Sequence, residues 1–472
     1  MRLMALPAPV GVQKTVVTFE ATGHKVVLGT AGSGKTTMAI LRAAFLSNPT
    51  LANGGRTLLV TFNTALAGYL RHMLPDDLPG DVTVEHYHKF ARGYLNRCGL
   101  LGGWGSIVRD SGVREGLIRD ARDLALAKNP ENPMRDFTVN RIAEEISWLC
   151  RQGFPDRETF VAHGNDTVHQ SDLTAAERAG LYDVYEDYLH VRAQTNPPHR
   201  FDWEDIATAV RIAFESDTSD RHYKHVVIDE GQDFSPEMIR SLVAAVPADG
   251  SVTLFGDAAQ QIYGRRISWR DAGLNVHEPI MFKKNYRNTR QIAELGLAIA
   301  AMPYYQGQPD MVAPDEYRAE GPPVGLLRFP SFDAERAFIK EQATEAIRSG
   351  QSVGILTRRR DDANWFARQI PRVQLLSNAS GDWNPGAVIS AGTLHAGKGL
   401  EFDMVFLPHV SSDWLPDPAL VRALGMEEAE AQDGRALYVG VTRARQRLIL
   451  TTCRELTSLL PTTPGLWEEL TP

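Results

Sequence analysis

The feature that most constrains this chain of 472 residues is the run GTAGSGKT at positions 29–36. It fits the phosphate-binding loop pattern G-x-x-x-x-G-K-[ST], in which glycines let backbone N–H groups turn towards phosphate oxygens. The apolar segment HKVVL precedes it and the helix-forming segment TTMAILRAAFL follows it, which is the strand–loop–helix context that the pattern requires. The sequence therefore predicts a site for a nucleoside triphosphate, ATP or GTP.

This loop supplies most of the expected phosphate contacts. Lys35 would bind the β- and γ-phosphates, and Thr36 would bind Mg²⁺ through its hydroxyl. The predicted cofactor contacts in this segment are Gly29, Thr30, Ala31, Gly32, Ser33, Gly34, Lys35, Thr36 and Thr37.

A second motif, VVIDEGQD at 226–233, ends an apolar strand with two adjacent carboxylates. Ligands of open α/β sheets lie at the carboxyl ends of the strands, which is where this pair falls. Asp229 would hold the Mg²⁺, and Glu230 would align and deprotonate the attacking water. An isolated Asp-Glu pair is usually surface charge, but its occurrence together with the phosphate loop favours catalysis.

Apolar, β-branched runs alternate with helical stretches along the chain, a pattern typical of parallel sheets with crossover helices. Between two such α/β units, residues 91–200 are rich in Ala, Glu, Arg and Leu at helical spacing. They predict a helical insertion in the first unit. The strand candidates are 24–28, 57–62, 225–229 and 251–255 in the first unit, and 280–282, 353–357, 388–390, 404–407 and 447–451 in the second.

Composition limits the class of protein. The chain is 43% hydrophobic and has a net charge of −8, so a nucleic-acid surface would be a local positive track on an acidic body. Its three cysteines are too far apart for a zinc cluster or a disulfide framework. Prolines interrupt the N-terminal apolar patch, and no window approaches the roughly 18 apolar residues of a membrane span. We expect a soluble, cytoplasmic protein without a membrane partner.

Three further motifs favour a motor over other phosphate-loop proteins: GDAAQQIYG at 256–264, KNYR at 284–287 and YVGVTRAR at 438–445. Gln260 follows a strand end, where it could sense a γ-phosphate. Arginines that reach the phosphate from a second domain make hydrolysis depend on closure of the cleft. Each arginine taken alone is more often a surface salt bridge.

In this order the motifs resemble those of superfamily 1 DNA helicases of the UvrD/Rep/PcrA type, over nearly the whole chain. GTAGSGKTT, VVIDEGQD, GDAAQQIYG, NYRNT, TLHAGKGLEF and YVGVTRA are similar to motifs I to VI. The resemblance implies an α/β fold of two RecA-like P-loop NTPase domains, parallel sheets with flanking helices, with an α-helical insertion in the first. The implied boundaries are 1–90 and 205–275 for domain 1A, 91–204 for the 1B-like insertion and 276–472 for domain 2A.

The resemblance also implies ATP as the nucleotide and roles for residues of both domains. The implied nucleotide and catalytic residues are Gln13 reading the adenine, Tyr286 stacking on it, Glu401 touching the ribose, Arg287 and Arg443 at the γ-phosphate, and Gln260 coupling the domains. The implied nucleic-acid contacts stack bases or bond phosphates without reading sequence. They are Phe62, Asn63, Tyr87, His88, Tyr263, Arg266, Thr393 and His395.

Two departures from the family pattern matter. Arg265 stands where motif III usually has a tryptophan, so Arg265 or the nearby Trp269 would replace it in the base track. Only 105 residues separate Arg287 from Thr393, and core strands and helices need most of them. The large 2B insertion of full-sized relatives is therefore expected to be absent.

The predicted function is an ATP-dependent translocase and helicase on single-stranded DNA or a single/double-strand junction, moving 3′ to 5′ by resemblance. The alternative is a nucleotide-gated DNA-binding or recruitment subunit that needs a partner protein, such as a separate nuclease, for unwinding. Only 27 residues follow Arg445, so we do not expect a nuclease domain in the same chain. DNA repair, plasmid maintenance and phage defence stay open as settings.

Overall fold

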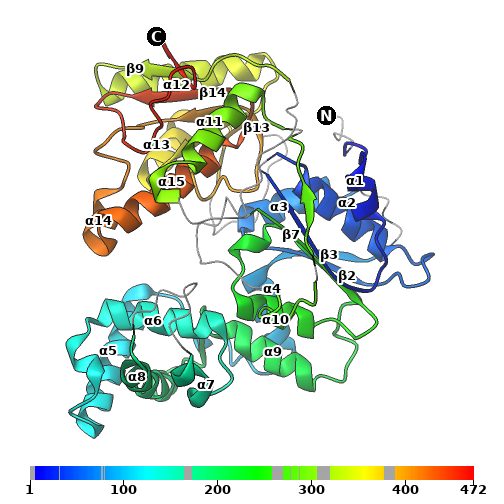
Figure 1. The fold of residues 1–472 in the computed structure, drawn as a ribbon, viewed down its shortest axis with the longest axis vertical. Coiled ribbons are helices and arrows are strands. Elements are labelled where there is room, and N and C mark those ends of the chain that lie inside the picture. Colours follow the sequence, from blue (N-terminus) through cyan, green and yellow to red (C-terminus); the bar gives the residue numbers. More distant parts are fainter. Residues whose placement is uncertain are drawn as a thin grey trace.

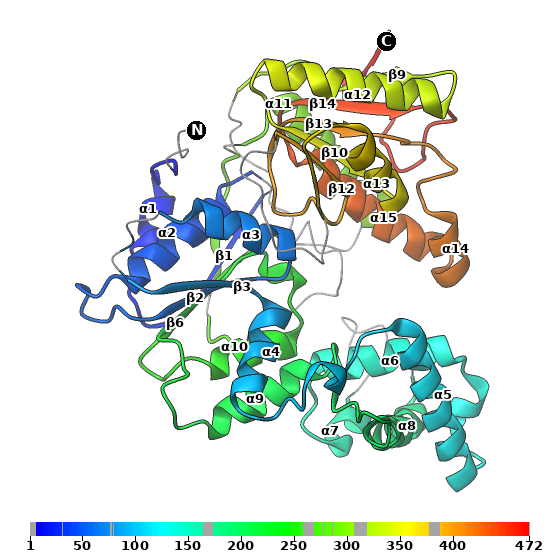
Figure 2. The ribbon, with the colours of Figure 1, turned by 180° about the vertical axis from the view of Figure 1, so that it is seen from behind.

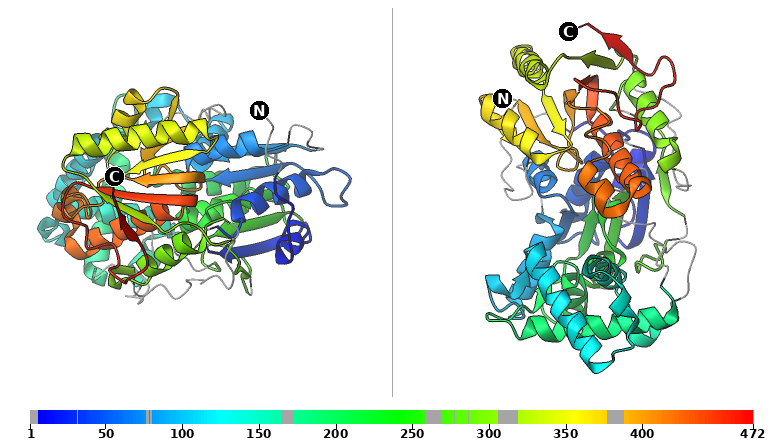
Figure 3. Two further views of the ribbon diagram at one scale, coloured as in Figure 1. Left: turned by 90° about the horizontal axis from the view of Figure 1, so that it is seen from above. Right: turned by 90° about the vertical axis from the view of Figure 1, so that its left-hand side faces the viewer.

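The computed structural model describes residues 6–471 apart from residue 31, 76–77, 79, 164–172, 258–268, 277, 286, 306–318 and 377–387. The described residues form two parallel sheets with flanking helices and a separate group of helices (Figure 1). This is the predicted fold, two RecA-like lobes with a helical insertion in the first. The second lobe and the helical insertion lie at opposite ends of the molecule's long axis, and the first lobe adjoins both (Figure 3, right).

The first sheet has the strand order β3-β2-β6-β7-β1-β8, and all neighbouring pairs are parallel. Most of its residues are buried apolar side chains, as expected for a sheet covered on both faces. Because β1 and β6 are separated only by β7, the loops after them emerge close together. The strands are β1 (Gly23–Gly29), β2 (Thr57–Thr61), β3 (Val82–His86), β6 (His225–Ile228), β7 (Ser251–Gly256) and β8 (Ile280–Phe282). The flanking helices are α1 (Val12–Val17), α2 (Lys35–Ser47), α3 (Thr64–Met73), α4 (Tyr87–Arg97), α9 (Ile206–Ser216) and α10 (Pro236–Ala244).

The second sheet has the order β11-β12-β10-β13-β14-β9-β15 and is also parallel throughout. Its strands are β9 (Gly325–Arg328), β10 (Val353–Thr357), β11 (Val373–Leu375), β12 (Ile389–Thr393), β13 (Phe402–Leu407), β14 (Ala444–Thr452) and β15 (Glu468–Leu470). Its helices are α11 (Arg290–Ala300), α12 (Phe332–Arg348), α13 (Arg360–Gln369), α14 (Pro418–Leu424) and α15 (Met426–Val441).

One predicted strand lies in the other sheet. The run 280–282 was expected in the second unit, but β8 pairs with β1 of the first sheet, from Val27↔Ile280 to Gly29↔Phe282. The prediction that residues 280–282 belong to the second sheet is wrong, because so short an apolar run carries no information about the strand with which it pairs. The half-buried edge strand β3 was not predicted at all.

The helical insertion has a hydrophobic core of its own, built around α5 (Ser111–Lys128), α6 (Val139–Gln152), α7 (Arg157–Ala162) and α8 (Ala175–Ala193) (Figure 2). Helix α8 begins with a capping box, in which Thr174 and Glu177 each bond the other's backbone N–H. Two short parallel strands, β4 (Ile107–Val108) and β5 (Phe201–Asp202), connect the insertion to the first lobe, with Ile107 opposite Phe201.

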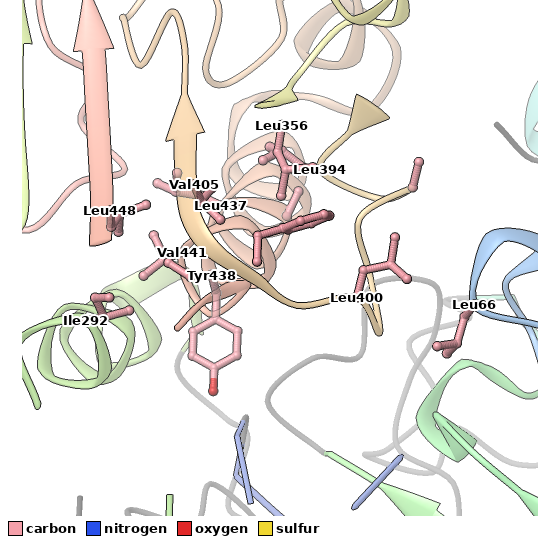
Figure 4. Packing of buried hydrophobic residues seen from close by; sticks show 14 of the residues in the cluster. Leu66, Ile292, Leu356, Leu394, Leu400, Val405, Leu437, Tyr438, Val441 and Leu448 are labelled. Carbon is pink, nitrogen blue, oxygen red and sulfur yellow. The ribbon is translucent and has the colours of Figure 1, made fainter. Parts of the chain in front are cut away.

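The two lobes share one continuous core. Figure 4 shows Leu66 of α3 next to Leu400, on the loop that precedes β13. Gly399 adopts a φ of +79°, and a Cβ there would lie 2.4 Å from a methyl carbon of Leu66. Only glycine fits this crossing point, so the loop of motif V rests directly on the first lobe. In the described parts of the chain, no helix is both long and apolar enough to cross a membrane.

Candidate nucleotide and nucleic-acid site

The phosphate loop leads from β1 directly into α2, which begins at Lys35. Its N-cap residue Gly34 has a φ of +86° and no side chain that could compete for the first N–H groups of the helix. Nζ of Lys35 donates to the carbonyl oxygens of Gly29 and Thr30, at 2.8 and 2.7 Å. Burial lowers the pKa of Lys35, while Asp257, 3.4 Å away, favours the charged form.

Gln13 packs against the same loop from α1. Its Nε2 donates to the carbonyl oxygen of Ser33 at 3.1 Å, and its Oε1 accepts from the backbone N–H of Val10 at 3.1 Å. The side chain is therefore fixed beside the loop, although its reading of adenine stays a prediction. Ala31 and Tyr286 lie outside the described residues.

Asp229 and Glu230 follow β6 at the edge of the sheet from which the phosphate loop emerges. The Thr36 hydroxyl lies beside Asp229 and favours the ionised form of its carboxyl, which lowers its pKa. Burial, and then the neighbouring Glu230, raise the pKa of Asp229 to about 7. Its Oδ2 is buried without a hydrogen-bond partner. A hydroxyl beside an unsatisfied carboxylate oxygen is a donor set that Mg²⁺ prefers, so these two residues fit the predicted metal.

Three other buried polar atoms around the loop also lack a hydrogen-bond partner among the described residues: Thr30 Oγ1, Ser33 Oγ and Arg287 Nε. Buried polar groups in proteins are nearly always paired, so a cluster of exceptions needs a reason. Hydroxyl and guanidinium donors suit phosphate oxygens. The loop thus has unused hydrogen-bonding capacity of the kind that a triphosphate needs.

Glu230 has a φ of +55°, a conformation that is uncommon for a residue other than glycine and that occurs often at active sites. Burial alone would raise the pKa of its carboxyl. The nearby cations, Lys398 first and then Arg443 and Lys35, outweigh burial and hold that pKa below its usual value. Glu230 is therefore ionised at neutral pH, as a general base must be.

Gln232 connects this carboxylate to the neighbouring strand. Its Nε2 donates to Glu230, and its Oε1 accepts from the backbone N–H of Asp257 at 2.8 Å. Asp257 is the first residue after β7 and is also the ion-pair partner of Lys35. Motifs I, II and III are thus joined by one hydrogen-bonded chain. Gln260 of motif III lies outside the described residues.

The second lobe brings both predicted arginines to this site. Arg287 forms an ion pair with Glu401, which gives that glutamate an observed partner other than the predicted ribose. Arg443 is 1% exposed, and its guanidinium donates to the carbonyl oxygens of Val439 at 3.0 Å and Leu400 at 3.4 Å. Burial, and then the nearby Arg287, lower the pKa of Arg443 to about 10.

The loop touches this arginine-bearing segment directly. Gly32 has a φ of +80°, and a Cβ there would lie 2.3 Å from Oδ1 of Asn285 and 2.8 Å from Cβ of Arg287. A second contact between the lobes is the ion pair of Lys398 with Asp233, at 2.6 Å, with both side chains almost fully buried. The candidate nucleotide site therefore takes residues from both lobes.

Comparison with known proteins agrees with this geometry. Residues 11–280 match the UvrD/REP helicase N-terminal domain, and residues 374–455 match the UvrD-like helicase C-terminal domain. The first match alone covers more than half of the chain. The chain belongs to the UvrD/REP helicase family. As a member, it is an ATP hydrolase of the helicase class.

Among curated relatives, the ATP-dependent DNA helicase UvrD2 of Mycobacterium tuberculosis is 23% identical over 554 aligned residues, covering 91% of this chain and 76% of that protein. A probable DNA helicase of Mycoplasma pneumoniae is 23% identical over 468 residues, covering 93% of this chain and 82% of that protein. A solved C-terminal domain of a possible DNA helicase from Lactobacillus plantarum covers 39% of this chain and 98% of its own, at 18% identity and a TM-score of 0.29.

The predicted nucleic-acid residues that follow β2 and β3 divide into two groups. Tyr87 is completely buried and its hydroxyl pairs with Ser241 at 2.7 Å, so its prediction as a strand contact is wrong. Phe62 and His88 are half-buried and meet edge to face at 5.5 Å, and Trp203 also meets His88 edge to face, at 5.1 Å. Burial lowers the pKa of His88 to about 4, so this aromatic group is uncharged near neutral pH.

Asn63 holds the start of α3 in place, and its contact with the nucleic-acid strand stays a prediction. Its Oδ1 caps α3 by accepting from the N–H groups of Ala65 and Leu66, and its Nδ2 faces the carbonyl oxygen of Lys398 at 3.4 Å. In motif V, the Thr393 hydroxyl accepts from the N–H of Ala396. His395 is half-buried, and burial lowers its pKa to about 4.

The described residues do not cover the motif III part of the predicted strand track, since Tyr263, Arg265 and Arg266 lie outside them. Trp269 is described and packs against the core of the first lobe. Sequence reasoning missed the polar residues that connect the motifs, namely Gln232, Asp233, Asn285, Asn288 and Lys398. All five stand inside quoted motifs or next to them, and this was the only signal that could have found them.

Proposed function

We propose that this protein is an ATP-driven motor that translocates 3′ to 5′ on single-stranded DNA and separates strands at a junction. The observation that carries the proposal is the contact of Gly32 with the 285–288 segment, which makes the phosphate loop and the arginines parts of one site. A site shared by two lobes converts a change of nucleotide into a change of lobe arrangement. We also place the protein in the cytoplasm.

In the nucleotide-bound state, Thr36 and Asp229 would hold Mg²⁺, which neutralises charge on the β- and γ-phosphates when bound. Lys35 exchanges the carbonyl oxygens of Gly29 and Thr30 for phosphate oxygens. The loop's N–H groups and the N-terminus of α2 surround the phosphates. Gln13 and Tyr286 would contact the adenine.

Hydrolysis then uses residues of both lobes. The Glu230 carboxylate accepts a proton from water while the water oxygen bonds to the γ-phosphorus. The bond from the γ-phosphorus to the bridging oxygen breaks, and its electrons stay on ADP. Arg287 and Arg443 stabilise the charge that develops on the transferred group. Because both arginines belong to the second lobe, hydrolysis requires the lobes to be closed.

The strand would cross the edge of both lobes, over Phe62, His88 and Trp203 in the first and Thr393 and His395 in the second. Aromatic faces stack any base with about 1–3 kcal/mol per base, so such a track tolerates all sequences. Single-stranded DNA, or a junction with duplex, is accordingly the proposed substrate.

A second candidate is a recruitment subunit that opens and closes on DNA but needs a partner protein, such as a nuclease, for unwinding. Between Arg287 and Thr393, the described residues belong to the second sheet, its helices and a short turn, with 306–318 and 377–387 outside the description. The UvrD2 alignment is longer than this whole chain, so that relative has additional residues in the aligned region. The chain has fewer residues than this relative in the aligned region, and that difference favours the second candidate, a subunit that needs a partner for unwinding.

The deciding experiment measures ATP hydrolysis with and without single-stranded DNA or RNA, using Lys35→Ala as the blank. A DNA-dependent rise of about tenfold or more, equal to about 1.4 kcal/mol off the barrier, supports a motor. A rate that ignores both nucleic acids refutes it. Strand displacement by the isolated chain then separates the candidates, since a recruitment subunit hydrolyses ATP but releases no strand.

A further inference from the structure

Asn288, a residue with no assigned role, lies between the two arginines of the site. Its side chain is completely buried. Its Nδ2 donates to the carbonyl oxygens of Thr442 at 3.1 Å and Ala444 at 2.5 Å, the two residues that flank Arg443. Both amide protons are thus used to hold the backbone around one arginine.

The other end of the amide holds the turn that carries the second arginine. Oδ1 of Asn288 accepts from Nδ2 of Asn285 at 3.0 Å. Oδ1 of Asn285 in turn accepts from the backbone N–H groups of Arg287 at 2.9 Å and Asn288 at 3.0 Å. The two asparagines therefore close the turn around Arg287 and join it to the segment of Arg443.

The same pair of amides lies against the phosphate loop. A Cβ on Gly32 would be 2.3 Å from Oδ1 of Asn285 and 2.7 Å from Oδ1 of Asn288. A shift of the loop would consequently press on the pair that fixes both arginines. One amide group supplies two donors and one acceptor here, which neither a carboxylate nor a hydroxyl of similar size can do.

We propose that Asn288 is a positioning residue that makes Arg287 and Arg443 move as one unit against the phosphate loop. This inference rests on the proposed function, because it assigns the arginines their place at the γ-phosphate. Asn288 touches no reacting atom and acts only through the arginines. Its loss should therefore lower kcat for ATP much more than it changes KM, because the arginines act in the transition state.

The test uses the full chain with Asn288→Asp, which keeps the size of the side chain but replaces both donors by acceptors. Asn132→Asp is the matched control. Asn132 is equally buried and lies in the distant helical insertion, where its Nδ2 donates to the carbonyl oxygen of Gly180 at 3.2 Å and faces the carboxylate of Asp183 at 3.5 Å. We expect Asn288→Asp to lower kcat by at least about tenfold, with KM changed by less than about threefold, and Asn132→Asp to leave both near the wild-type values. If melting shows that Asn288→Asp is unfolded, Asn288→Ala replaces it.

The decisive readout is a double-variant cycle. In an Arg443→Ala background, the Asn288 change should lower kcat by clearly less than it does in the wild-type chain, because one of the two arginines through which it acts is already gone. An equal loss in both backgrounds, or a folded variant with normal kcat, overturns the inference. If the wild-type chain hydrolyses ATP at a rate that does not depend on DNA, the proposed motor function is refuted. The role of Asn288 can still be decided in that case, by measuring the same double-variant cycle on the DNA-independent rate. A chain with no hydrolysis at all refutes both.

Discussion

Removing one partner of the buried ion pair between Lys398 and Asp233, which joins the two lobes, should destabilise the protein strongly. Nζ and Oδ1 are 2.6 Å apart, and the side chains are 3% and 2% exposed, so solvent screens neither charge. Lys398→Met leaves the carboxylate buried without its counter-charge, and such a loss costs about 3–5 kcal/mol. We therefore expect a decrease of about 3–5 kcal/mol in the free energy of unfolding at about pH 8.

The loss should depend on pH with a definite sign. Burial raises the pKa of Asp233 to about 6, above the value in an unfolded chain. A carboxyl of this kind stabilises the fold when protonated, and that stability is lost as the pH rises through about 6. In Lys398→Met no counter-charge opposes burial, so the variant should recover stability as the pH falls towards about 5.

Denaturant unfolding of Lys398→Met, Asp233→Asn and the double variant is the assay. The double variant should lose less than the sum of the two singles, because it leaves no unpaired charge. Arg328→Met is the control: its ion pair with Glu469 is 2.7 Å long but about half exposed, so about 0–1 kcal/mol is expected. Losses below about 1 kcal/mol for both singles, or strictly additive ones, would refute the reasoning.

Three further predictions concern the site itself. Because the pKa of Asp229 is raised to about 7, the Mg²⁺ affinity in ATP hydrolysis should fall about tenfold per pH unit below that value, and a pH-independent affinity would contradict the proposed ligand. Gly32→Ala should lower kcat by at least about tenfold, since its Cβ would meet Asn285, whereas Gly350→Ala, with a similar φ of +76° but nothing within 4 Å, should hydrolyse ATP normally. Tyr87→Phe should lose about 1 kcal/mol of stability with its hydroxyl pair and keep its affinity for single-stranded DNA in an anisotropy titration, whereas weaker binding would mean that Tyr87 does contact DNA.

Local sequence was sufficient for the parts of the fold that are specified locally. The phosphate loop, the strand before it and the carboxylates after β6 are each defined by a few consecutive residues. Apolar runs therefore predicted most strands to within three residues of their ends. The sheet to which Ile280–Phe282 belongs depends on tertiary pairing, which a three-residue run cannot encode.

The site was harder to predict where its partners are far apart in the chain. Asn288 bonds residues 154 and 156 positions away, and Lys398 bonds one 165 positions away, so no spacing rule could reveal these contacts. Tyr87 was misjudged because an aromatic residue after a strand can face either way. It opens α4, and the helix turns its ring into the core, against Phe234 at 5.8 Å.

The strands β4 and β5 have a consequence for how such a protein can change over generations. Ile107 and Phe201 are paired neighbours, about 4.8 Å apart as in any sheet, although ninety-odd residues separate them in sequence. When the chain enters and leaves an inserted domain at adjacent points, evolution can add, replace or delete that domain without changing the strand connections of the first sheet. The helical insertion is thus joined to the first lobe at one place and has a hydrophobic core of its own. Its sequence can therefore diverge while the candidate ATP site stays unaltered.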